Sequence, residues 1–158
     1  MSTSQAVSMT PLILAPTGYG KTLPILTAVK AFIEETGIKP IFWLVRSLSL
    51  GRRVAEDAEL VGLKTFTAGG REKSCNLKLS GENIDPHKYC RYFRFKCEYY
   101  LNMGDLRGVY EVVEDYKDLL KLLPSQCCYF TQERIFVYFD IIVQNYFRRR
   151  HYGLSLIH

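Results

Sequence analysis

A glycine-containing turn at residues 15–22 (APTGYGKT) joins a short apolar run to a stretch that favours a helix. The apolar run, residues 11–15 (PLILA), is typical of a buried parallel strand. The stretch after the turn, residues 21–35, has apolar side chains at helical spacing and is followed by Gly37, a common helix stop. Pro24 falls in the first turn of this helix, where proline is tolerated. This order of strand, turn and helix predicts the beginning of an α/β fold.

The alternation of strand and helix continues along the chain. A second strand is expected at residues 41–45 (IFWLV), an unbroken apolar run that begins after Pro40. Residues 48–62 favour a helix, and residues 64–68 (KTFTA) indicate a third strand. Because the strands alternate with helices, we expect them to form a parallel sheet.

The pattern breaks after the third strand. Residues 69–104 are rich in Gly, Cys, Asn, Lys and Tyr and show no clear period. Residues 109–123 then carry apolar side chains at helical spacing, which predicts one amphipathic helix that stops before Pro124. Residues 128–138 indicate another helix, and residues 140–144 (DIIVQ) a strand that returns to the sheet. The sequence therefore predicts an α/β layer with a long insert.

The residue types of the glycine turn suit a phosphate group. Gly18 and Gly20 allow the backbone to curl so that several N–H groups converge on phosphate oxygens. Lys21 places a positive charge beside the β- and γ-phosphates, and the Thr22 hydroxyl can ligate Mg²⁺. We assign the binding of ATP with Mg²⁺ to this loop, which consists of Ala15, Pro16, Thr17, Gly18, Tyr19, Gly20, Lys21 and Thr22.

The chain contains five cysteines. Because its first residues lack the basic region of a secretory signal and their apolar stretch is very short, we expect a cytoplasmic protein with reduced thiols. No apolar run reaches the roughly 20 residues of a membrane span. Cys75, Cys90, Cys97 and Cys127 are separated by 15, 7 and 30 residues, and Cys128 adjoins the last. This spacing contains no Cys-x-x-Cys pair, so by itself it leaves buried free thiols and metal ligands equally open.

Several stretches resemble, in the same order, the landmarks of the iron–sulfur DNA helicases of the XPD/DinG type. Residues 15–22 resemble the first ATPase motif of superfamily 2 helicases, which commonly begins with alanine instead of glycine. The other stretches are an apolar strand ending in arginine (LVRS, 44–47), the opening of the iron–sulfur domain (GREKSC, 70–75), its closing Cys-Pro-Tyr-Tyr (CCYF, 127–130), and the strand and Asn-Tyr that follow (FDIIVQNY, 139–146). Together they span nearly the whole chain.

The resemblance implies an α/β fold in which a partial RecA-like parallel sheet is interrupted by a cysteine-rich, mostly helical iron–sulfur module. We expect residues 1–69 to form the first part of the ATP-binding domain. Residues 70–135 would form the insert, and residues 136–158 the return strand of the ATP-binding domain.

The resemblance also implies a 4Fe–4S cluster held by one thiolate from each of Cys75, Cys90, Cys97 and Cys127. Cys128 stands where the family has proline, so it could replace Cys127 as the ligand. Zinc held by the same four thiolates is the chemical alternative, and His87 is a further candidate ligand.

A net charge of +5 permits nucleic-acid binding. The sequence HKYCRYFRFKCEYY (87–100) interleaves aromatic side chains that can stack on bases with cations that can pair with phosphates. An aromatic core with charges around it is the equally weighted alternative, and the arginines at 148–150 suit a solvated face. We expect single-stranded DNA as the partner, bound by Arg46, Arg91, Tyr92, Arg94 and Lys96.

The family consists of ATP-dependent DNA helicases, hydrolases that serve DNA repair. Their Asp-Glu-Ala-His motif, which holds Mg²⁺ and activates water, should follow the region of Asn145 and Tyr146, but no such tetrapeptide is present. The arginine finger of a second RecA-like domain is missing as well. We therefore expect the N-terminal segment of such a helicase, unable to hydrolyse ATP alone. The alternative is a non-catalytic iron–sulfur or zinc module that binds nucleic acid.

Overall fold

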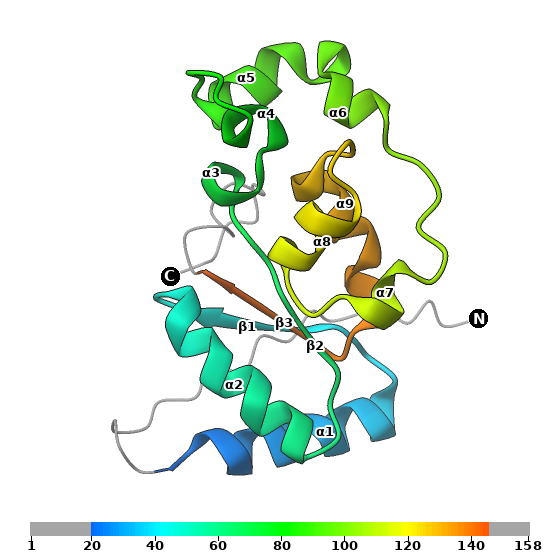
Figure 1. The fold of residues 1–158 in the computed structure, drawn as a ribbon. Helices are drawn as coiled ribbons and strands as arrows, with labels where there is room; N and C mark the ends of the chain where they lie inside the picture. The colour runs from blue at the N-terminus through cyan, green and yellow to red at the C-terminus, as the bar shows by residue number, and fades with distance from the viewer. Residues whose placement is uncertain (1–19, 146–158) are drawn as a thin grey trace, which may run out of the picture.

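The computed structural model describes residues 20–145, which form a mixed α/β fold around a three-stranded parallel sheet (Figure 1). The last strand along the chain lies in the middle of the sheet, where Ile141 is opposite Ile41 on one side and Thr65 on the other. The strands are β1 (Ile41–Val45), β2 (Thr65–Thr67) and β3 (Ile141–Asn145), in the spatial order β1-β3-β2.

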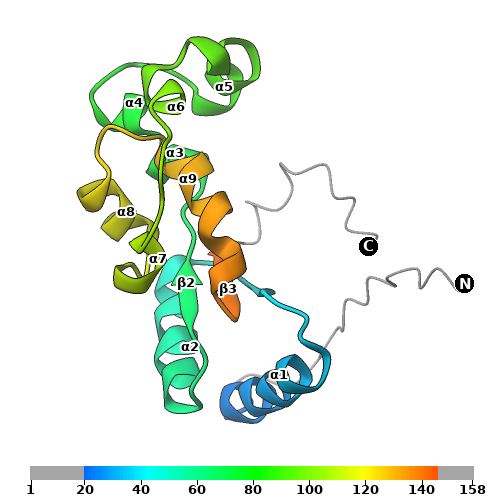
Figure 2. The same cartoon turned by 90° about the vertical axis from the view of Figure 1, so that its right-hand side faces the viewer.

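Two helices, α1 (Thr22–Thr36) and α2 (Leu48–Leu60), cover one face of the sheet (Figures 1 and 2). Leu26 of α1 and Ala58 of α2 are fully buried against Ile141 and Val143 of β3. Side chains alternate across a strand, so Ile142 between them belongs to the core on the opposite face.

The segment between β2 and β3 covers that opposite face with helices. The core there joins Phe66 and Ile142 of the sheet to Val113, Leu119 and Ile135. The part of the segment around α4, α5 and α6 lies farthest from the sheet in both views (Figures 1 and 2). The elements are α3 (Arg71–Ser74), α4 (Asn76–Leu79), α5 (Pro86–Phe93), the 3₁₀ turn η1 (Arg94–Lys96), α6 (Glu98–Leu101), α7 (Val109–Val112), α8 (Tyr116–Leu122), α9 (Cys128–Ile135) and the 3₁₀ turn η2 (Phe136–Tyr138).

A buried glutamine connects this helical segment to the end of β2. The Gly69 backbone N–H donates to Oε1 of Gln132 at 3.1 Å, and Nε2 of Gln132 donates to the Gly69 carbonyl oxygen at 2.7 Å. Gln132 is fully buried, so the pair satisfies a side chain and a backbone unit that water does not reach.

Most of the expected elements between residues 20 and 145 are present. The strands expected at 41–45, 64–68 and 140–144 correspond to β1, β2 and β3. The two early helices are confirmed, and α1 is followed by Gly37 in the left-handed conformation, with φ of +68°. The strand expected at 11–15 and the arginines at 148–150 lie outside the described residues.

The single helix expected over residues 109–123 is wrong. The chain forms two short helices, α7 and α8, separated by an extended stretch. Asp115 begins α8 with a capping box, in which its side chain accepts from the Asp118 N–H and the Asp118 carboxylate accepts from the Asp115 N–H. The Thr67 N–H also donates to the Glu114 carbonyl oxygen at 2.9 Å. The capping box at Asp115 and the backbone bond between Thr67 and Glu114 therefore interrupt the helix, although the apolar side chains keep their helical spacing.

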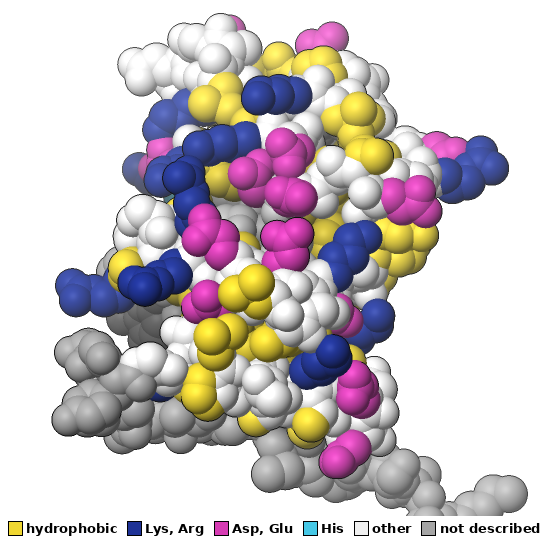
Figure 3. Space-filling view, turned by 60° about the horizontal axis from the view of Figure 1, so that its bottom comes forward, with side chains coloured by type: hydrophobic (Ala, Val, Ile, Leu, Met, Phe, Trp, Pro, Cys, Tyr) yellow, Lys and Arg dark blue, Asp and Glu magenta, His cyan; other side chains and the backbone are white. Residues whose placement is uncertain are grey.

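The outer side of α1 and α2 presents acidic, basic and apolar side chains close together (Figure 3). Leu50 and Leu60 are among the exposed apolar residues of α2. Within residues 20–145, no helix is both long and apolar enough to cross a membrane.

Candidate functional site

Three of the four predicted cluster ligands occupy the same local position. Cys75, Cys97 and Cys127 each immediately precede a helix, with φ of −76°, −74° and −65° and ψ of 107°, 119° and 106°. The helices that follow are α4, α6 and α9. The first N–H groups of a helix have no partner within that helix, so a sulfur at this position can accept from them.

Hydrogen bonds join the second and third of these segments. The Cys127 N–H donates to the carbonyl oxygen of Tyr99, in α6, at 2.9 Å. Nearby, Nδ2 of Asn102 donates to the Ser125 carbonyl oxygen at 3.4 Å. The chain that leads into Cys127 is therefore held against the helix that follows Cys97.

Asn76 joins the first segment to the third. It follows Cys75 directly and is buried. Its Oδ1 accepts from the Cys128 N–H at 2.8 Å, and its Nδ2 donates to the Pro124 carbonyl oxygen at 3.3 Å. The sequence alone did not single out Asn76, because one asparagine in a polar stretch carries no recognisable pattern.

The thiol of Cys127 lies in the electrostatic field of the other three predicted ligands. Burial is the main cause that raises its pKa to about 12, and the Phe130 backbone N–H partly opposes the shift. The negative charges of Cys90, Cys97 and Cys75 raise this pKa further. Charge interactions of this kind require proximity, so the structure brings the four predicted ligands into one region.

Cys90, in α5, shows the same grouping. Burial raises the pKa of its thiol, the guanidinium of Arg71 lowers it, the charges of Cys75 and Cys97 raise it, and the guanidinium of Arg94 lowers it. Two cations therefore act electrostatically on the Cys90 thiol.

Cys128, the competitor for Cys127, lies in a different environment. Its Sγ donates to the Tyr116 carbonyl oxygen at 3.4 Å, and it belongs to the apolar core that covers the sheet. Cys127 is the last residue before α9, whereas Cys128 is the first residue of that helix. This one-residue step directs the two thiols to different neighbours.

Two arginines pack on the aromatic ring of Phe130. The Arg71 guanidinium lies 5.7 Å from the centre of this ring, and also 4.7 Å from that of Tyr129. The Arg94 guanidinium lies 5.3 Å from the Phe130 ring. Both Nε atoms are buried, and neither has a hydrogen-bond partner among the described residues. Buried donors of this kind normally have an acceptor.

The resemblance implies that these four thiols hold an iron–sulfur cluster. Within residues 20–145, no three His, Cys, Asp or Glu side chains are grouped around the position of a single metal ion. A zinc–sulfur bond is about 2.3 Å long, so four sulfurs on one zinc lie only about 4 Å apart. In a 4Fe–4S cluster each cysteine binds a different iron, which sets the sulfurs farther apart. The sulfur atoms of such a cluster could also accept from the two buried Nε groups.

The aromatic and basic residues beside the thiols divide into two groups. Tyr92 and Phe95 are each 69% exposed, and Arg91 and Lys96 are exposed as well. The Arg91 guanidinium lies 5.7 Å from the centre of the Tyr92 ring. Arg94, by contrast, is only partly exposed and packs inward. Four of these five side chains are therefore available to a nucleic acid.

Arg46 lies elsewhere, just beyond the carboxyl end of β1 and far from α5 (Figure 1). Its side chain is exposed, and its carbonyl oxygen accepts from Nδ2 of Asn145 at 2.9 Å. The structure therefore does not bring Arg46 together with the basic residues of the insert.

The predicted phosphate loop is described only at its end, since residues 15–19 lie outside the described range. Gly20 adopts the left-handed conformation, with φ of +57°, which favours glycine at this position. Lys21 immediately precedes α1, and Thr22 is its first residue. In Figure 1, α1 begins on the side of the molecule where β1 ends. Ligands of parallel sheets commonly bind at this carboxyl edge.

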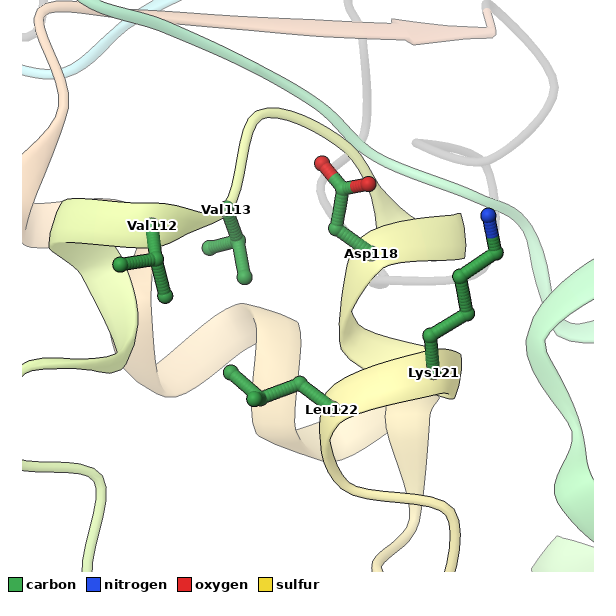
Figure 4. Close-up of a pocket in the computed structure, with 5 residues that line it drawn as sticks. All are labelled: Val112, Val113, Asp118, Lys121 and Leu122. Atoms are coloured by element: carbon green, nitrogen blue, oxygen red, sulfur yellow. The ribbon is translucent and has the colours of Figure 1, made fainter.

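An open pocket of about 330 Å³ lies between α7 and α8 (Figure 4). It is lined by Val112, Val113, Asp118, Lys121 and Leu122, none of which was predicted to be functional. Asp118 already accepts two backbone N–H groups in the capping box and beside it. The only carboxylate that lines this pocket is therefore already bonded to the backbone at the start of α8.

Comparison of the chain with protein-family models, with curated proteins and with solved structures gives no match.

Proposed function

We propose that this chain is the N-terminal segment of an ATP-dependent DNA helicase of the XPD/DinG type, with a RecA-like sheet and an iron–sulfur insert. The observation that carries the proposal is the grouping of Cys75, Cys90, Cys97 and Cys127 in one electrostatic region, with Cys128 directed into the apolar core. The selection of four thiols out of five matches the ligand set that the resemblance implies.

In this proposal one thiolate from each of the four cysteines holds a 4Fe–4S cluster. When bound, the cluster supplies a cross-link between distant segments and a redox-active iron centre. Three of the four cysteine-bearing segments are connected by hydrogen bonds of the protein itself. The Cys127 N–H donates to Tyr99, and the side chain of Asn76 bonds to the segment that contains Cys127.

The nucleotide would bind at the amino end of α1. Lys21 supplies positive charge to the phosphates, Thr22 supplies a hydroxyl for Mg²⁺, and the helix adds its positive dipole end. The printed sequence contains no Asp-Glu-Ala-His motif, so we propose that this chain binds ATP with Mg²⁺ but does not turn it over alone.

Single-stranded DNA would bind across the exposed side of α5 and η1. Tyr92 offers a ring to a base, while Arg91 and Lys96 neutralise phosphates. Arg46 would contact the strand at the carboxyl edge of the sheet.

The test is metal analysis of the chain purified without oxygen. We expect brown protein with about four iron atoms and matching sulfide per chain. Cys75→Ser should abolish the iron, whereas Cys128→Ser, the matched control, should leave most of it in place because this thiol faces the Tyr116 carbonyl. Colourless protein with stoichiometric zinc would overturn the proposal and favour the zinc module.

A further inference from the structure

Arg94 differs from its basic neighbours in where its charge lies. Arg91 and Lys96 are exposed, whereas the Arg94 guanidinium is enclosed by aromatic rings. Its centre lies 5.0 Å from the ring centre of Phe95, 5.5 Å from that of Tyr100 and 5.3 Å from that of Phe130. Three rings from three parts of the insert therefore fix the position of one cation.

The rings leave part of the guanidinium unsatisfied. Ring faces attract its charge, but they are poor substitutes for an oxygen or sulfur acceptor. The Nε of Arg94 is buried and has no hydrogen-bond partner within the described part of the chain. A donor in this situation is destabilising unless an acceptor is supplied from outside the protein.

The group that faces Arg94 is the cysteine region. Arg94 lies between two predicted ligands, four residues after Cys90, and its carbonyl oxygen accepts from the Cys97 N–H at 3.0 Å. Phe130, on which Arg94 packs, belongs to α9 and lies three residues after Cys127. Arg94 thus lies beside the segments that carry three of the four predicted ligands.

We propose that Arg94 is a positioning residue of the metal site and not a contact to DNA. It places a fixed positive charge and an Nε–H donor beside the anionic metal–thiolate group, and the three rings hold it there. This inference rests on the proposed function, since it requires that the cysteines hold a cluster.

Two consequences follow from a fixed cation beside a redox-active anionic group. The cation stabilises the bound cluster, so removing it should speed the loss of iron. It also stabilises the more negative, reduced form, so removing it should lower the reduction potential of the cluster. A residue that only fills space would change the first property without a matching change in the second.

The experiment compares Arg94→Gln, Arg94→Lys and Arg91→Gln in the full 158-residue chain purified without oxygen. For Arg94→Gln we expect iron release to a chelator about tenfold faster than in the wild type, and a lower reduction potential. Arg94→Lys should have the reduction potential of the wild type, because lysine retains the positive charge. Arg91→Gln, the exposed neighbour, should retain its iron at the wild-type rate.

Binding of a labelled single-stranded oligonucleotide separates the two roles of arginine. Arg91→Gln should weaken binding and Arg94→Gln should not. The inference is overturned if Arg94→Gln keeps the iron release rate and potential of the wild type, or if Arg94→Lys shifts the potential as far as the glutamine variant does. Should Arg94→Gln fail to fold, a reduction potential of Arg94→Lys below that of the wild type overturns the inference, because lysine retains the charge. A wild-type chain without iron would overturn the proposed function together with this inference, whereas an unaffected Arg94→Gln variant would overturn the inference alone.

Discussion

At the scale of single residues, Cys127 and Cys128 show how backbone position distinguishes two adjacent thiols. Resemblance to a family motif singled out Cys127, but the sequence left Cys128 open as a competitor. Cys127 precedes α9 and interacts electrostatically with the other three thiols, while Cys128 opens the helix and donates to the Tyr116 carbonyl oxygen. The difference depends on where a helix begins, and boundaries are among the features that sequence patterns locate least well.

Asn76 carries the first prediction. Replacing it with alanine removes the acceptor of the Cys128 N–H and the donor to the Pro124 carbonyl oxygen, and leaves a buried N–H unsatisfied. We expect Asn76→Ala to lower the free energy of unfolding by about 1–3 kcal/mol, measured by urea unfolding of metal-free protein. Asn102→Ala is the control, because the bond of Asn102 to Ser125 is exposed and 3.4 Å long. Equal losses in the two variants would contradict the prediction.

At the scale of secondary-structure elements, length decides what could be predicted. α1 and α2 are long enough for a helical period, and their predicted and observed positions agree closely. In contrast, α3, α4 and α6 have four residues each, which is little more than one turn, so no period can appear. The break between α7 and α8 was missed for another reason, since apolar spacing continues across it while hydrogen bonds to Thr67 and within the capping box interrupt the helix.

The second prediction tests this break. Asp115→Ala removes the side chain that accepts from the Asp118 N–H at the start of α8. We expect a loss of about 0.5–2 kcal/mol in the free energy of unfolding, measured by urea titration. Asp105→Ala should be nearly neutral by comparison, because the partner of Asp105 in the described chain is the exposed side chain and N–H of Arg107. If Asp115→Ala were as mild as this control, the capping box would not be what divides the two helices.

At the scale of the whole molecule, the convergence of the cysteines could not be derived from their spacing. The segments that carry them are far apart in the sequence and meet through the hydrogen bonds of Asn76 and of the Cys127 N–H. The sequence pattern predicted the same role, contact with DNA phosphates, for Arg91, Arg94 and Lys96. The structure separates them, because Arg94 packs on three rings while Arg91 and Lys96 remain exposed.

The exposed aromatic residues of this region lead to the third prediction, which concerns DNA binding by the whole chain. Tyr92 is 69% exposed, and an exposed ring that stacks on a base contributes about 1–3 kcal/mol. We expect Tyr92→Ala to weaken binding of a labelled single-stranded oligonucleotide by this amount, measured by fluorescence anisotropy. The salt dependence should stay as in the wild type, because the substitution removes a ring and no charge.

Phe32→Ala is the matched control for this measurement. Phe32 is another exposed aromatic residue, 42% accessible, but it lies on α1, on the opposite face of the sheet from the insert. If rings bound DNA merely because they are exposed, both variants would lose affinity to a similar extent. Loss in Tyr92→Ala alone places the strand across α5. Wild-type affinity in Tyr92→Ala would mean that this ring does not contact the strand.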